Sequence, residues 1–152
     1  MQLDETDRQI MAELRRDGRA AMSVVAQAVH ISRANAYARV NRMIEAGVIT
    51  GFGVRIDPVR AGQHSSAYVE LSIRQESWQQ VREQLLRIDA VAHIALIGGE
   101  FDVILLVRAR DNRELRRVVL EELQAIPEVR TTRTSLIFED LEPLDEAAVS
   151  AR

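Results

Sequence analysis

The sequence predicts an α+β protein with a helical N-terminal head and a larger body of the ferredoxin-like type. Three observations predict this fold. Up to Gly47 the apolar residues recur with the period of a helix, and directly after it they alternate as in a strand. From residue 65 onward, strand-like and helix-like segments follow in the order β-α-β-β-α-β. That order is typical of a four-stranded antiparallel sheet with both helices on one face.

The first helix should span residues 4–16. Asp4 is its expected N-cap, because a short acidic side chain can accept hydrogen bonds from the free amide groups of the first turn. Gly18 is expected to take the left-handed conformation that ends many helices. The apolar stripe of this helix comprises Leu3, Ile10, Met11 and Leu14.

Two further helices, joined by a tight turn, form the stretch around which the chain is organised. One starts near Ser23, and the other begins after the N-cap Ser32 and stops at Gly47. His30 lies in the turn between them, where we expect a residue at positive φ rather than a metal ligand or a catalytic group. The three helices together predict a helix-turn-helix head of the winged type.

The outer face of the third helix has the character of a surface that lies in a DNA major groove. Its inner stripe is formed by Ala36, Val40 and Met43. On the outer side, small side chains permit close approach, Asn and Arg can contact base edges, and marginal Arg can bind phosphate. The alternative is a solvated amphipathic helix. The outer and flanking residues are Arg33, Ala34, Asn35, Tyr37, Ala38, Arg39, Asn41, Arg42 and Glu45.

The composition is that of an ordinary globular chain, with 47% hydrophobic and 28% charged residues. A net charge of -3 does not indicate a nucleic-acid-binding protein, so such a function must rest on local charge. Residues 1–51 hold seven Arg against six acidic residues, whereas residues 60–152 hold twelve Arg against sixteen. The excess positive charge lies in the third helix, which has three Arg and one Glu.

Several kinds of site are excluded by residues that the chain lacks. Without cysteine there is no disulfide, no thiolate nucleophile and no cysteine-ligated metal site. We expect no cofactor and no catalytic residue, because no catalytic triad, carboxylate pair, Walker loop or metal cluster stands out. No apolar run reaches the ~20 residues of a membrane span, and the N-terminus is unlike a signal peptide. A cytoplasmic protein is therefore expected.

The segment after the head alternates apolar and other residues over positions 48–56, which predicts a short strand ended by Asp57 and Pro58. A linker follows, and a second strand starts at Ser66. Its alternation is regular, so one face of this strand should be buried. The inward-facing residues are expected to be Ala67, Val69, Leu71 and Ile73.

The remainder of the body alternates helix and strand. After a first helix, strands over residues 91–97 and 101–108 flank a hairpin loop with two glycines. A second helix, capped by Asp111 or Asn112, leads to a last strand over residues 129–138. We therefore divide the chain into the head (1–50), a hinge strand and linker (51–64), the body (65–140) and an acidic tail (141–152).

The chain carries a series of short motifs: Leu3-Asp4, Asp7-Arg8, Asp17-Gly18-Arg19, Gly47-Val48-Ile49, Gly51-Phe52, Asp57-Pro58 and Gly62. In this order and spacing, ahead of a βαββαβ body, they resemble the Lrp/AsnC family of bacterial and archaeal transcription regulators, the feast/famine proteins. The resemblance covers the chain from Leu3 to about Phe138. It implies a body of the RAM, or AsnC, type.

This resemblance implies a regulator of amino-acid or nitrogen metabolism genes that binds double-stranded DNA as a homodimer, with dimers assembling into tetramers or octamers. The hinge strand, here Phe52 to Ile56, commonly pairs with its partner near the dyad. A symmetric dimer places two recognition helices one DNA turn or a multiple apart, so a pseudo-palindromic operator is expected. The residues expected to contact DNA by matching position are Ser32 and Tyr37, Asn35 and Asn41 for bases, Arg33 and Arg42 for phosphate, and Arg39, for which an intramolecular pair is the alternative.

The resemblance also implies an amino-acid effector bound between dimers, at the loop joining the second and third body strands and at the last strand. The family's usual loop is Thr-Gly-any-Tyr-Asp, whereas here Gly98 replaces the threonine and its hydroxyl. A glycine amide can bind a ligand carboxylate, and Asp102 its ammonium group. The alternative is that the glycines only shape a hairpin. The expected effector residues are Gly98, Gly99, Glu100, Asp102, Thr132 and Thr134.

Two other functions stay open from the sequence. Sirohaem decarboxylases resemble the same family, but they would need a basic, histidine-bearing pocket. Only His64 and His93 lie in the body region, and the recognition helix is rich in Arg. The other possibility is a protein that coats DNA with little sequence preference, which competition with an operator would separate from a specific regulator.

Overall fold

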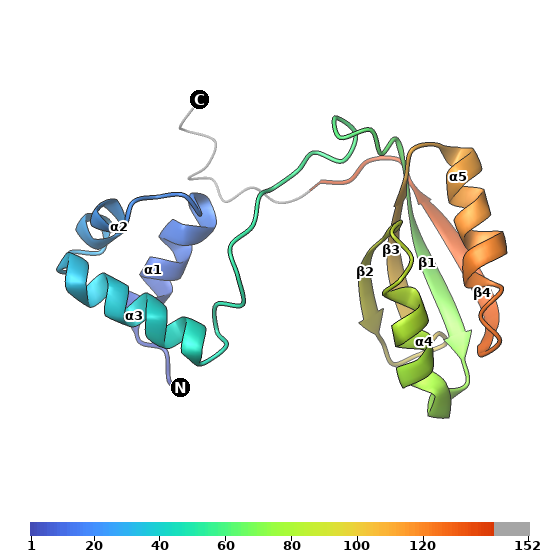
Figure 1. Ribbon diagram of the computed structural model, residues 1–152, viewed down its shortest axis with the longest axis horizontal. Helices are drawn as coiled ribbons and strands as arrows, with labels where there is room; N and C mark the ends of the chain where they lie inside the picture. The colour runs from blue at the N-terminus through green and yellow to red at the C-terminus, as the bar shows by residue number, and fades with distance from the viewer. Residues whose placement is uncertain (142–152) are drawn as a thin grey trace. The chain divides into compact units, whose positions relative to one another are not determined.

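The computed structural model describes residues 1–141, apart from the side chain of Gln75. These residues form two compact units, Met1–Arg55 and Ile56–Leu141 (Figure 1). The division falls inside the predicted hinge and linker. The predicted acidic tail, from residue 142 onward, lies outside the described residues.

The N-terminal unit consists of three helices: α1 (Glu5–Arg16), α2 (Met22–Ala28) and α3 (Arg33–Glu45). Asp4 caps α1 as predicted, because its side chain accepts a hydrogen bond from the amide of Asp7. The apolar stripes of the three helices meet in one small core, which leaves their other faces to solvent. The buried members of this core are Ile10, Val25, Val29, Val40 and Met43.

The turns of this unit follow the prediction at two positions and differ at a third. His30 has a φ of 56° and Gly47 a φ of 69°, so both take the left-handed conformation that was expected. The expectation for Gly18 was wrong. Helix α1 instead ends at Asp17 in extended conformation, with a φ of -141°, and the Asp17 side chain accepts a hydrogen bond from the amide of Arg19. This side-chain turn reverses the chain without a left-handed glycine.

The C-terminal unit has the predicted βαββαβ fold, with four antiparallel strands in the order β2-β3-β1-β4. Helix α4 (Trp78–Leu85) and helix α5 (Asn112–Arg117), which a π-helical segment (Val118–Leu123) extends, share the core with one face of the sheet. Asp111 is the N-cap of α5. The strands are β1 (Ser65–Ile73), β2 (Val91–Leu96), β3 (Val103–Ala109) and β4 (Val129–Ile137).

The buried face of β1 was predicted correctly, because its alternate residues from Ala67 to Ile73 are all buried. No helix within residues 1–141 combines the length and the apolar composition that a membrane span requires.

The hinge strand predicted over residues 48–56 is absent from the single chain. A strand needs a neighbouring strand for its backbone hydrogen bonds, and the sheet of the described residues, β2-β3-β1-β4, does not include this segment. Its apolar side chains are largely open to solvent, with exposed fractions of 56% for Phe52, 80% for Val54 and 67% for Ile56. The sequence therefore has the apolar alternation of a strand, but within one chain these apolar side chains are not buried.

Candidate nucleic-acid interface

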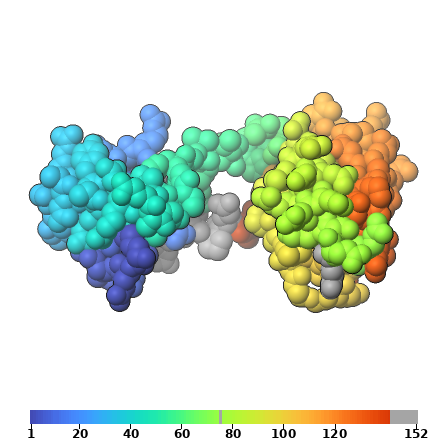
Figure 2. Space-filling model, turned by 60° about the horizontal axis from the view of Figure 1, so that its bottom comes forward, coloured from blue at the N-terminus to red at the C-terminus, as the bar shows by residue number. Residues whose placement is uncertain are grey.

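Helix α3 turns its small and amide-bearing side chains outward. The Ser32 hydroxyl caps the helix by accepting a hydrogen bond from the amide of Asn35 at 3.2 Å. The inner stripe predicted for this helix is buried, and the opposite side is open. Figure 2 shows this surface, coloured cyan, on the side of the N-terminal unit turned to the viewer. The exposed residues of this outer face are Arg33, Ala34, Asn35, Tyr37, Ala38, Asn41, Arg42 and Glu45.

Arg33 lies over the ring of Tyr37, with 5.5 Å between the guanidinium carbon and the ring centroid. The two residues are one helical turn apart at the N-terminal half of α3, and both are exposed. This stacking orders a long cationic side chain without using its N–H donors. Those donors remain directed to solvent, where a phosphate can accept from them.

A buried carboxylate binds two arginines of α3. Asp7 of α1 is fully buried, and its oxygens accept from Arg39 Nη1 at 2.8 Å and from Arg42 Nη2 at 2.9 Å. A carboxylate out of contact with water needs such cationic partners. Asp7 also accepts a hydrogen bond from the amide of Asp4, which completes a capping box at the start of α1. One side chain thus stabilises α1 and holds α3 against it.

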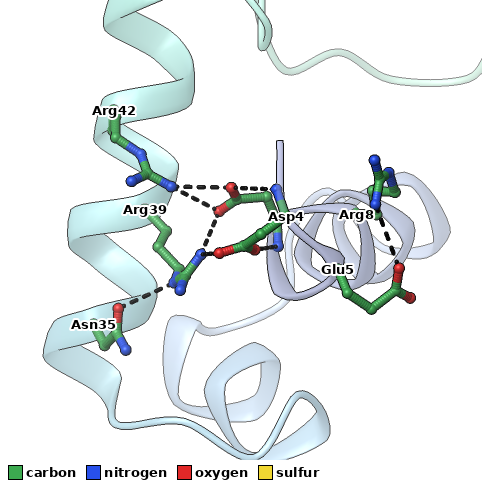
Figure 3. A network of polar contacts seen from close by, with 7 residues as sticks. Asp4, Glu5, Arg8, Asn35, Arg39 and Arg42 are labelled. Atoms are coloured by element: carbon green, nitrogen blue, oxygen red, sulfur yellow. Dashed lines mark hydrogen bonds and ion pairs between the residues drawn. The ribbon is translucent and has the colours of Figure 1, made fainter. Parts of the chain in front are cut away.

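Arg39 is the centre of this network, as Figure 3 shows. Its Nη1 also binds Asp4 at 2.7 Å, and its Nε donates to Asn35 Oδ1 at 3.2 Å. The hydrogen bond from Arg39, together with that from the Asp7 amide, lowers the pKa of the Asp4 carboxyl below its usual value. Of the two roles left open for Arg39, the intramolecular pair is the one that the structure contains.

Arg42, which was expected to bind phosphate, is also paired within the N-terminal unit. Its Nη2 contacts both oxygens of Asp7, at 3.1 and 2.9 Å, although 53% of the side chain is exposed. Its charge is therefore shared with a buried carboxylate. The sequence analysis missed Asp7 as a partner. Two features of the sequence could have indicated this contact: the Asp4-x-x-Asp7 spacing of a capping box, and the two arginines three residues apart on α3.

In the C-terminal unit, the loop between β2 and β3 is anchored to the end of β1. Asp102 Oδ2 accepts from the amide of Ile73 at 2.8 Å, and the Asp102 amide donates to the carbonyl of Leu71 at 2.9 Å. Gly99 has a φ of 147°, which side-chain-bearing residues rarely adopt. Asp102 and Gly99 thus shape the loop, whatever else they bind.

Arg133 of β4 contacts the same loop, and the sequence analysis missed it. Its guanidinium lies 4.4 Å from the centroid of the Phe101 ring, 2.6 Å from Glu70 and 3.8 Å from Glu100. The hydrogen bond from Arg133 lowers the pKa of the Glu70 carboxyl. Glu70 and Arg133 are direct partners in the β1–β4 register, so aligning those two segments would have revealed opposite charges at matching positions.

The two predicted threonines do not join the loop in one pocket. Thr132 Oγ1 accepts from Gln124 on the helix side of the sheet, at 2.9 Å. Arg133 precedes Thr134 by one residue, so it faces the opposite side. Thr132 and Thr134 therefore lie on the helix side of the sheet, and Arg133, which contacts Glu100, lies on the other side. Thr134 instead lines a pocket of about 430 Å³ with Asn112, Leu115, Arg116, Val119, Leu120 and Leu136.

No group of three or more His, Asp or Glu side chains within residues 1–141 is placed to hold a metal ion.

Comparison with known proteins shows two family matches. Residues 3–50 match the winged helix-turn-helix DNA-binding family, and residues 66–145 match the Lrp/AsnC ligand binding domain.

Two curated relatives and one solved structure illustrate the similarity. The HTH-type transcriptional regulator AldR of Mycobacterium tuberculosis is 37% identical, covering 92% of this chain and 80% of its own length. The proline dehydrogenase transcriptional activator of Rhodobacter capsulatus is 34% identical, covering 90% and 91%. A transcriptional regulator of Neisseria meningitidis, solved in complex with L-Met, has a TM-score of 0.87 at 20% identity, with 95% of both chains covered. The two curated relatives are regulators of transcription, not enzymes.

Proposed function

Because the chain belongs to the Lrp/AsnC family of HTH-type transcriptional regulators, with a DNA-binding and a ligand-binding domain, we propose that it recognises a specific operator through the outer face of α3. The observation that carries this proposal is the solvent-exposed surface of α3, whose side chains are small or carry amides. Asp7 of the neighbouring α1 binds Arg39 and Arg42, so α3 is held in place while it presents this surface.

The role that we assign to each side chain of α3 follows from its solvent exposure and from its contacts within the chain. Asn41 and Asn35 carry amides suited to base edges, and Arg33 carries a solvent-directed guanidinium suited to phosphate. Ser32 and Tyr37 border the same surface. Arg39 and Arg42 contribute mainly by holding α3 at a fixed angle on α1.

A homodimer is the assembly that fits this role. The segment from Phe52 to Ile56, which joins no strand of the described sheet, can pair with the same segment of a second chain, which would cover its exposed apolar side chains. Two heads related by a dyad would read a pseudo-palindromic operator, and further assembly into tetramers or octamers would add avidity. Binding to genomic DNA requires a cytoplasmic protein.

An amino acid is the proposed effector. The candidate residues lie on two faces of the sheet in one chain, so a complete site would need a second copy of the chain. The backbone of Gly98 and Gly99, and Asp102, Thr132 and Thr134, supply suitable polar groups, while Glu100 is paired with Arg133. The L-Met complex of the Neisseria regulator supports this class of ligand. The Rhodobacter activator supports target genes of amino-acid or nitrogen metabolism.

The test is fluorescence anisotropy with the full chain. DNA from upstream of the protein's own gene is compared with unrelated DNA at one salt concentration, and each amino acid is then added. We expect a preference of about a thousandfold or more for the upstream DNA and a shift with one amino acid. Equal binding to both DNAs would instead support a protein that coats DNA without reading it.

A further inference from the structure

The ion-pair network between α1 and α3 ends on a residue of the outer face of α3. Arg39 Nε donates to Asn35 Oδ1 at 3.2 Å, one helical turn away. The same guanidinium is bound by Asp4 at 2.7 Å and by Asp7 at 2.8 Å. Figure 3 shows these contacts running from α1 through Arg39 to Asn35.

The chemistry of these groups determines which way the Asn35 amide faces. A guanidinium has N–H donors and no acceptor, so only the amide oxygen can face it. The amide nitrogen, with its two donors, must then point away from Arg39. Arg39 itself cannot swing freely, because its side chain is only 21% exposed and is held by the fully buried Asp7. Asn35 is exposed, so its donors are open to a ligand.

We propose that Asp4, Asp7 and Arg39 form a positioning relay that makes Asn35 a hydrogen-bond donor in the major groove. This inference rests on the proposed function, because it requires α3 to lie on DNA. Asparagine usually recognises adenine through both amide atoms, accepting from N6 and donating to N7. Here Arg39 occupies one of the two lone pairs of the oxygen, so the oxygen faces Arg39 and the donors of Asn35 face away from it.

The base that Asn35 can contact follows from the donors and acceptors that each base presents in the major groove. Guanine offers two acceptors, O6 and N7, and thymine offers O4, whereas the polar group of cytosine is the N4 donor. Adenine places its N6 donor beside its N7 acceptor. Adenine, guanine and thymine each offer an acceptor to the Asn35 donors, so the operator should carry one of these three bases at the position read by Asn35 and should exclude cytosine.

Arg42 provides a matched control for Arg39. Both are arginines of α3 and both bind Asp7, but the hydrogen bond to Asn35 comes from Arg39. A loss of charge or of packing against α1 would affect both substitutions. A change in what Asn35 reads should follow from the Arg39 substitution alone.

The experiment is selection of bound sequences from a randomised DNA library by the full chain, followed by sequencing. We expect the wild type to select against cytosine at one position, and Asn35→Ala to lose that preference. In Arg39→Met, cytosine should rise at that position by about tenfold or more relative to the wild type, because the freed amide can turn its oxygen toward N4. In Arg42→Met the base preferences should stay unchanged.

Arg39→Lys is a second test variant, which keeps the proposal testable if Arg39→Met does not fold. It keeps a cation beside Asp7, but a single amine lacks the rigid fork that spans Asp4, Asp7 and Asn35, so the same shift toward cytosine is expected. Enrichment of cytosine at the Asn35-dependent position in the wild type, or the same shift in both arginine positions, would overturn the relay. If the Arg39 variants enrich a sequence with the same base preferences as the wild type, the relay is contradicted but the proposed function is not. If the wild type enriches no sequence, the proposed function fails with it.

Discussion

Asp7 is the residue on which the geometry of the head depends. Its carboxylate is fully buried, binds two arginines of α3 and closes the capping box of α1. The sequence predicted Asp4 as a helix cap, because capping is a local property of spacing. It did not predict that Asp7 would bind Arg39 and Arg42, because that contact depends on how two helices pack.

Replacing Asp7 with Asn should therefore destabilise the N-terminal unit by about 1–3 kcal/mol, because the arginines lose a buried charged acceptor. Urea unfolding can separate the two units. Trp78 is the single tryptophan and lies in the C-terminal unit, so its fluorescence reports that unit, while helical circular dichroism also reports the other. The dichroism transition should move and the fluorescence transition should not. The control is Glu5→Gln, whose exposed pair with Arg8 should contribute less than about 0.5 kcal/mol.

The stability of the same unit should depend on pH through Asp4. Its pKa is lowered in the folded state from 3.8, chiefly by the hydrogen bond from Arg39, so the folded state favours the charged form. Its contribution is complete above the unfolded pKa and is lost as the pH falls through the folded value. Asp4→Asn should be less stable than the wild type at pH 6, and the gap should narrow toward pH 3. Parallel stability curves for the two proteins would contradict this assignment.

At the scale of secondary structure, the periodicity of the sequence predicted the elements well. The alternation from Ala67 to Ile73 and the glycine stop at Gly47 depend on local patterns, and both are found in the structure. The π-helical segment Val118–Leu123 was not predicted, because a local change of helical hydrogen bonding leaves little mark on apolar spacing. The end of α1 at Arg16 was predicted correctly, but the Asp17 side chain makes the turn that was assigned to a left-handed Gly18.

The left-handed stop of α3 gives a prediction at this scale. A Cβ added at Gly47 would meet no atom within 4 Å, so the cost of Gly47→Ala comes from its φ of 69° alone. We expect a loss of about 1 kcal/mol in the N-terminal unit. Gly51→Ala is the matched control, because that site is equally open and its φ lies outside the left-handed region. Equal stability of the two variants would show that the backbone conformation at Gly47 carries no cost.

At the scale of the whole molecule, the two-unit organisation followed from the change of period after Gly47. The predicted effector residues Thr132 and Glu100 lie apart in one chain, because strand register places Thr132 on the helix side of the sheet and Arg133, the partner of Glu100, on the other side. The hinge was assigned as a strand from its alternation, yet in one chain it joins no strand of the described sheet. Both features belong to the contacts that we propose with a second chain.

Self-association should therefore depend on the hinge. Val54 is 80% exposed in the single chain, and burying it between two copies would contribute about 1.5 kcal/mol or more. Val54→Asp should raise the dimer dissociation constant at least about tenfold in analytical ultracentrifugation. Val59→Asp, outside the alternating segment at 55% exposure, is the control. Unchanged association of the Val54 variant would exclude the hinge from the interface.

Reading of DNA by the outer face of α3 is tested most directly by the affinity of the full chain for its operator and for unrelated DNA at one salt concentration. The variant Arg33→Ala with Asn41→Ala removes a cation and an amide from α3 and leaves the Asp7 network intact. The control, Arg8→Ala with Gln9→Ala, removes the same two groups from an exposed part of α1. We predict that the wild type and the control keep a preference of about a thousandfold, and that the α3 variant loses it. An α3 variant that still prefers the operator as the wild type does would contradict the account.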